Sequence, residues 1–125
     1  MIIRETDEPF IRQVTAHPDV WKYVSGIEDY RDYEIPDGVY YTLLNDGVKA
    51  GFMAFLPEDG AASVHIAVLP EHRGAWLEPT DKTALTDHGG KLIAKVRHRR
   101  VYALAYRVGF RQVGKDAKYT YMELT

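Results

Sequence analysis

Cysteine is absent from the 125 residues of this chain. Its absence excludes disulfide bonds, thiolate metal ligands and cysteine nucleophiles, and it suits a reducing cytosol. No apolar run approaches the roughly 20 residues that a membrane-spanning helix needs. The N-terminus also lacks the apolar segment of a signal peptide. We therefore expect a cytoplasmic protein that has no contact with a membrane.

Several other functional signatures are missing as well. The five histidines show no His-x-x-x-His or Glu-x-x-His pairing, so no metal site is expected. No Gly-x-Ser-x-Gly sequence supports serine hydrolase chemistry. A net charge of −2 gives no general reason to expect nucleic acid as a partner. What remains is an ordinary soluble composition, 46% hydrophobic and 27% charged, of a length that suits one domain over residues 1–125.

Apolar periodicity and turn residues predict an alternation of strands and helices along this domain. The predicted strands are 2–5, 39–44, 48–56, 61–69, 91–96, 110–113 and 119–124, and the predicted helices are 7–16, 18–24, 79–87 and 99–108. An acidic, tyrosine-bearing loop is expected over 25–38. This order predicts an α+β fold, with a central mixed, mostly antiparallel sheet flanked by helices.

The segment from Ser63 to Gly74 carries the clearest functional signal. An apolar strand runs to Pro70 and is followed by Arg73-Gly74 and a segment that can begin a helix. A basic, glycine-containing turn before a helix offers backbone N–H groups to a phosphate. The alternative is a simple connection between strand and helix.

This segment reads Val68-Leu-Pro-Glu-His-Arg-Gly74, and further on the chain has Gly109-Phe110 and Gly114. Together they resemble the acyl-CoA-binding core of the GCN5-related N-acetyltransferases, the GNAT family. The order of predicted elements is also that of the family, so the resemblance covers nearly the whole chain. Within the family, the fragment from His65 to Gly74 is most similar to compact GNAT-like proteins encoded by tailed bacteriophages.

The resemblance implies an N-acetyltransferase that transfers an acetyl group from acetyl-CoA to a primary amine. It implies that the strands ending near Val68 and Lys95 diverge and that CoA lies between them. The implied cofactor contacts are Ile66, Ala67 and Val68 for pantetheine, Arg73, Gly74 and Ala75 for pyrophosphate, and Lys95 and Arg99 for phosphate. For the basic run 95–100, a solvated helix start is the alternative interpretation.

Candidate catalytic residues follow from position within this scheme. Glu71 at the strand end, or His65 acting through water, is a candidate general base. Tyr102 or Tyr106 is a candidate acid that protonates the leaving thiolate. A structural histidine and a surface glutamate are the alternatives for His65 and Glu71.

Several positions depart from the family pattern, among them Pro79, which delays the next helix, and His98, which stands where an asparagine often opens the last helix. Trp76 and Glu78 stand where small residues line the phosphate, and Ala105 stands where a tyrosine often acts as general acid. These departures support a second hypothesis, a catalytically inactive GNAT-like protein of phage origin whose acetyl-CoA binding is lost. Such a protein would act in the host cytoplasm through protein partners, in head assembly or as a virion-associated factor. A homodimer is compatible with either hypothesis.

Overall fold

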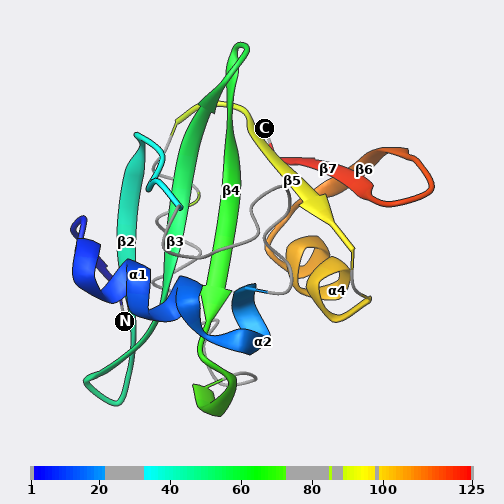
Figure 1. Cartoon of the computed structure of the whole chain (residues 1–125). Coiled ribbons are helices and arrows are strands. Elements are labelled where there is room, and N and C mark those ends of the chain that lie inside the picture. The colour runs from blue at the N-terminus through cyan, green and yellow to red at the C-terminus, as the bar shows by residue number, and fades with distance from the viewer. Residues whose placement is uncertain (1, 22–32, 73–84, 86–88, 98, 125) are drawn as a thin grey trace.

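The computed structural model describes residues 2–21, 33–72, 85, 89–97 and 99–124. Within these residues, seven strands form one sheet in the order β1-β2-β3-β4-β5-β7-β6 (Figure 1). The strands are β1 Ile2–Arg4, β2 Val39–Asn45, β3 Val48–Glu58, β4 Ala61–Val68, β5 Leu92–Val96, β6 Arg111–Lys115 and β7 Thr120–Leu124. The helices are α1 Glu8–Ala16, α2 Pro18–Trp21 and α4 Arg99–Arg107, with a 3-10 turn, η2, at Pro70–His72. The predicted α+β class is confirmed.

Strand pairing is antiparallel throughout this sheet except between β4 and β5. The mixed, mostly antiparallel sheet that the sequence predicts is therefore present. The predicted helix 79–87 lies outside the described residues apart from Leu85, which is buried. The predicted loop 25–38 is described only from Tyr33 onward.

Helix α1 begins where the sequence places its cap. The Asp7 carboxylate accepts a hydrogen bond from the Phe10 amide at 3.3 Å, and Pro9 occupies the first turn, where no N–H is required. Phe10, Ile11 and Val14 are buried on one face, as their spacing predicts. The helix ends at Ala16, because the residue that precedes Pro18 is disfavoured in helical conformation.

The β3 strand continues two residues beyond the predicted end at Leu56. Pro57 pairs with Ala62, and Glu58 pairs with Ala61. The Ala62 amide donates to the Lys91 carbonyl at 3.0 Å and so points away from β3. Pro57 and Ala62 therefore form a non-hydrogen-bonded antiparallel pair. Proline is tolerated at this position because no hydrogen bond between the two strands requires its missing N–H.

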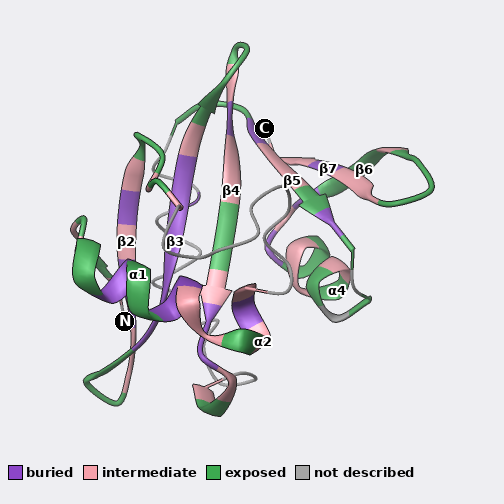
Figure 2. Ribbon diagram, viewed as in Figure 1, coloured by how far each residue is buried: buried purple, intermediate pink, exposed green. Residues whose placement is uncertain are grey.

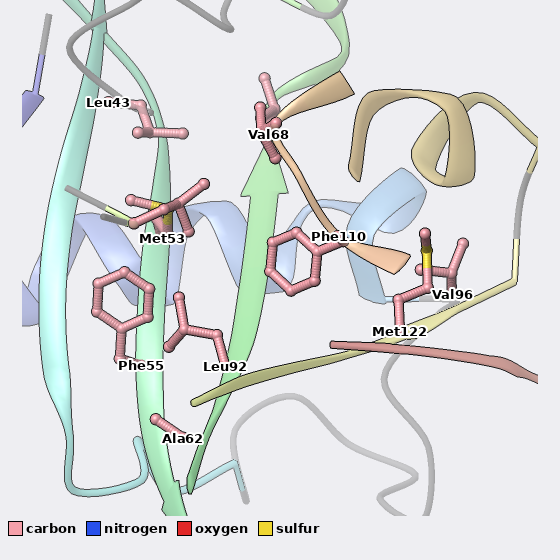
Figure 3. Close-up of a cluster of buried hydrophobic side chains, with 11 residues drawn as sticks. Leu43, Met53, Phe55, Ala62, Val68, Leu92, Val96, Phe110 and Met122 are labelled. Atoms are coloured by element: carbon pink, nitrogen blue, oxygen red, sulfur yellow. The ribbon is translucent and has the colours of Figure 1, made fainter. Parts of the chain in front are cut away.

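Side chains of the sheet alternate between two buried clusters. The α1 side cluster contains Phe10, Ile11, Val14, Val20, Tyr40, Phe52, Ala54 and Leu69. The α4 side cluster contains Leu43, Met53, Phe55, Ala62, Val68, Leu85, Leu92, Val96, Val108, Phe110 and Met122 (Figure 3). Consecutive residues of β3 enter opposite clusters, as strand geometry requires. Both faces of the central strands are therefore covered, whereas the middle of β4 is exposed (Figure 2).

Candidate functional site: the divergence of β4 and β5

The parallel pairing between β4 and β5 is short. Its register contains only Ala62 with Leu92 and Ser63 with Ile93. Beyond Ser63, β4 continues to Val68 in full register with β3, while β5 continues to Val96 in full register with β7. Figure 1 shows β5 running away from β4 toward α4. The divergence that the resemblance predicts between these two strands is confirmed.

This divergence leaves two strand edges facing each other without a ladder between them. Backbone N–H and C=O groups are strong hydrogen-bonding groups that need partners when they leave water. An extended ligand with its own amide groups satisfies such edges in the same way as an added strand. Residues 64–68 of β4 and 94–96 of β5 provide the edges.

Ser63 and His65 lie on the α1 side of the sheet at the point where the pairing ends. Their neighbours Ala62, Val64 and Val68 pack into the α4 side cluster, so the odd-numbered residues face the other way. The Ser63–Ile93 register places Ile93, and with it Lys95, on the same side as Ser63. Three polar side chains, Ser63, His65 and Lys95, therefore share one side of the divergence.

His65 is exposed and is held by a neighbouring hydroxyl. Ser63 Oγ lies 3.0 Å from His65 Nε2. Desolvation by the surrounding strands and, second, the positive charge of Lys95 lower the pKa of His65 from its ordinary 6.5, while Glu58 acts in the opposite direction. The lowered pKa favours the neutral imidazole, which is the form that accepts a proton.

Glu71 occupies a different place. It is exposed in η2, six residues beyond His65 and past the end of β4. The turn is fixed to the β2–β3 hairpin because Asn45 Nδ2 lies 3.2 Å from His72 Nδ1 and the Leu69 amide donates to the Ala50 carbonyl at 2.9 Å. The two base candidates thus stand at opposite ends of the diverging part of β4.

Tyr102 and Tyr106 lie together on α4. Their rings stack with centroids 6.5 Å apart. The Tyr102 hydroxyl donates to Gln112 Oε1 of β6 at 3.4 Å, and the Arg111 guanidinium lies 4.1 Å from the Tyr106 ring centroid. Strands β5 and β7 separate β6 from β4, so these contacts group the two tyrosines with β6 rather than with His65.

A pocket of about 190 Å³ opens at the C-terminal end of β5. It is lined by Val96, Arg97, Arg99, Tyr102 and Thr120. Arg97 also lies over the Tyr119 ring, 5.7 Å from its centroid. Arg99, a predicted phosphate contact, is thus at a basic pocket, whereas Lys95 is on the α1 side beside His65.

Of the other predicted cofactor contacts, one group is described by the structure and the other is not. Ile66, Ala67 and Val68 form the diverging end of β4, with Ile66 39% exposed. Arg73, Gly74 and Ala75 lie outside the described residues, as do Trp76 and Glu78. The sequence reasoning missed Ser63, although an i, i+2 spacing from His65 on a strand was the signal that could have found it.

Two kinds of feature are absent from the described residues. No helix among them has the length and apolar character that crossing a membrane requires. Among the same residues, His, Asp and Glu side chains form no group of three or more that could hold a metal ion.

The chain is similar to known proteins in structure but has no match in sequence. No protein-family model and no curated protein matches the sequence. The fold is similar to that of Campylobacter jejuni N-acetyltransferase PseH in complex with acetyl coenzyme A, with a TM-score of 0.61 and 13% identity over 99% of this chain and 98% of that chain. A variant of the Vibrio cholerae spermidine N-acetyltransferase SpeG gives a TM-score of 0.67 and 11% identity over 99% and 92%.

A third similar structure is the PaiA N-acetyltransferase from Thermoplasma acidophilum in complex with coenzyme A. It gives a TM-score of 0.54 and 16% identity over 67% of this chain. This chain spans 58% of the PaiA chain. Together with the sheet order and the diverging strands, these similarities show that the chain has the GNAT acetyltransferase fold.

Proposed function

We propose that this protein is an acetyl-CoA-dependent N-acetyltransferase that acts on a primary amine. The observation that supports it is the end of β4–β5 pairing at Ser63, with His65 beside it, in a GNAT fold. The neighbours solved with CoA or acetyl-CoA, and the spermidine N-acetyltransferase among them, support the same proposal.

The diverging edge of β4 would hold the pantetheine arm. Pantetheine carries amide groups along an extended chain, so the backbone of Ile66, Ala67 and Val68 can pair with it as with a strand. The backbone of Arg73, Gly74 and Ala75 would hold the pyrophosphate. Arg99, at the rim of the 190 Å³ pocket, would contact a further phosphate.

The reaction proceeds by direct attack on the thioester, whose reactive carbonyl is supplied by acetyl-CoA. A base removes a proton from the substrate ammonium, the amine nitrogen bonds to the carbonyl carbon, and the carbon–sulfur bond breaks. The thiolate then takes a proton. The protein's part is to orient both substrates along β4 and to move these two protons.

His65 is the better supported base of the two candidates. It lies where β4 and β5 begin to separate. A pantetheine arm that enters from the wide end of the divergence would therefore place its thioester beside His65. Its lowered pKa keeps the imidazole free to accept a proton, directly or through water. Glu71 stays an alternative prediction for the wide end, and Tyr102 or Tyr106 stays the predicted acid for the thiolate.

Titration with acetyl-CoA tests this proposal. Calorimetry and thermal unfolding should both report binding, because a ligand at 100 times its dissociation constant stabilises the folded state by about 2.7 kcal/mol. Thiol release in the presence of a primary amine should then report turnover. No shift in unfolding at millimolar acetyl-CoA would overturn the proposal.

Matched variants locate the site. Gly74→Glu places a carboxylate against the pyrophosphate and should abolish binding, whereas Gly114→Glu, at a position where an added Cβ meets nothing within 4 Å, should not. His65→Gln should lower kcat roughly a hundredfold, the low end of the range for general acid–base catalysis, while leaving acetyl-CoA affinity unchanged.

A non-catalytic role is the second candidate, and Trp76 and Glu78 favour it. An indole and a carboxylate in place of small residues hinder the close approach of backbone to phosphate. The protein would then act through protein partners, as a head-assembly or virion-associated factor of a phage or as a homodimer. Failure to bind acetyl-CoA, with recovery of a specific partner from phage particles, would favour this candidate.

A further inference from the structure

Lys95 provides a cation on the α1 side of the diverging strands, and it has no ion-pair partner among the described residues. Lys95 is exposed near the end of β5, and its register partner on β7 is Tyr121. Its charge acts on His65 more strongly than that of Glu58, the acidic group that acts in the opposite direction. Of these two charges, that of Lys95 has the larger effect on His65.

Two other lysines of the sheet region, Lys91 and Lys49, are neutralised by carboxylates. Lys91 Nζ lies 2.9 Å from Glu123 Oε1, and Lys49 pairs with both Asp7 and Glu5. Within the described part of the chain, Lys95 has no such ion pair.

The Asp116 carboxylate, which contacts the register partner of Lys95, is engaged in other hydrogen bonds. Tyr121 donates its hydroxyl to Asp116 Oδ2 at 2.5 Å. The amides of Lys118 and Tyr119 donate to the other oxygen of the same carboxylate, at 2.8 and 2.7 Å. Asp116 is therefore held in the β6–β7 turn, and the ammonium of Lys95 is left for a ligand.

We propose that the amine acceptor also carries an anionic group, a carboxylate or a phosphate, and that Lys95 binds it. The inference rests on the proposed N-acetyltransferase function, because it concerns the acceptor of that reaction. Paired strands stand about 4.8 Å apart and these two are wider, so a group at Lys95 and an amine at His65 are separated by on the order of 5 Å or more. A small bifunctional amine spans that interval.

The positive charge of Lys95 disfavours a polyamine. A second ammonium placed near Lys95 is repelled, and on this side of the sheet the described carboxylates of Glu123 and Asp116 already have partners. The Glu58 carboxylate on the same side acts on His65 less strongly than Lys95 does. Like charges brought together at a binding site act against the wrong substrate. The acceptor class therefore differs from that of the spermidine enzyme to which the fold is similar.

The test compares four acceptors at saturating acetyl-CoA: glycine, O-phosphoethanolamine, uncharged ethanolamine and spermidine. At least one anionic amine should exceed ethanolamine tenfold or more in kcat/KM, and spermidine should be the poorest. Glycine against O-phosphoethanolamine distinguishes carboxylate from phosphate. Calorimetry of the better anionic amine into the CoA-saturated protein gives a readout that is independent of turnover.

Variants assign the effect to one side chain. Lys95→Gln should remove the advantage of the anionic amine, and Lys95→Glu should shift preference toward spermidine. Lys115→Gln, an exposed cation on β6, is the matched control and should change nothing. Circular dichroism of each variant confirms folding, which the exposure of both lysines favours.

The outcomes distinguish a wrong acceptor class from a wrong N-acetyltransferase function. If acetyl-CoA binds and ethanolamine or spermidine is preferred, or if Lys95→Gln leaves the preference unchanged, the acceptor class is wrong while the transferase proposal stands. If acetyl-CoA does not bind at all, both proposals fail together.

Discussion

His65 is the candidate-site residue for which both a positioning contact and a pKa shift are seen. Its ring is fixed by Ser63 Oγ, and its pKa is lowered by desolvation first and by Lys95 second. A lowered histidine pKa means that the folded protein binds the proton less readily than the unfolded chain does. Protonation of His65 therefore opposes folding, so its contribution to stability is lost as pH falls below the unfolded value of 6.5 toward the folded pKa.

Nuclear magnetic resonance titration of the His65 ring should give a pKa below 6.5 in the wild-type protein. Lys95→Gln should raise it, because the neighbouring positive charge is removed and desolvation remains. The acid limb of the pH–rate profile should move to higher pH in the same variant. A ring pKa that does not respond to Lys95→Gln would contradict the electrostatic coupling between the two strands.

At the scale of elements, the site depends on how closely β3 approaches β4. Gly51 lies opposite Val68, at the diverging end of β4. A Cβ added at Gly51 would stand 2.2 Å from the Ala67 carbonyl oxygen and 2.8 Å from Val68 Cα. These are backbone atoms, so the clash cannot be relieved by a side-chain rotation. Only glycine lets β3 position this part of β4.

Gly51→Ala should therefore lower the free energy of unfolding by about 1–3 kcal/mol, the usual cost of forcing extra volume into a packed region. It should also weaken acetyl-CoA binding, because Ala67 and Val68 must move. Gly114→Ala is the matched control, since an added Cβ there meets nothing within 4 Å. Urea unfolding of the two variants measures the difference, and equal stabilities would refute the close approach.

At the scale of the whole molecule, one buried cluster joins the two halves of the sheet. The α4 side cluster combines residues of β2, β3 and β4 with residues of β5 and β7, and Leu92 is fully buried at the short parallel pairing. Because β4 and β5 share only two paired residues each, hydrophobic packing must carry most of the connection between the halves.

Leu92→Ala should therefore destabilise the protein by about 2–5 kcal/mol, the range for removing a large buried aliphatic side chain. Unfolding should stay a single transition, since both halves share this cluster. Val113→Ala, at a side chain that is 58% exposed, should change stability by no more than about 0.5 kcal/mol. Two separate transitions by circular dichroism would show that the halves are independent.

Much of the fold could be predicted from local patterns. Asp7 and Pro9 mark the start of α1, and Asp46 and Gly47, both with positive φ, mark the β2–β3 turn. The end of β3 could not be predicted, because whether Pro57 sits in a strand depends on where its partner Ala62 directs its N–H group. That direction is set by pairing with a residue distant in sequence.

The sequence by itself determined most of the described strands and helices and the buried face of α1, because each follows from periodicity and turn chemistry along the chain. The strand edge from Ile66 to Val68 followed from the family resemblance. Only the tertiary structure decided that His65 shares a side of the sheet with Ser63 and Lys95, and that Tyr102 contacts β6. Which side chains are neighbours across strands depends on the register and on the residue at which a parallel pairing ends. Those depend on packing of the whole sheet, which no local segment specifies.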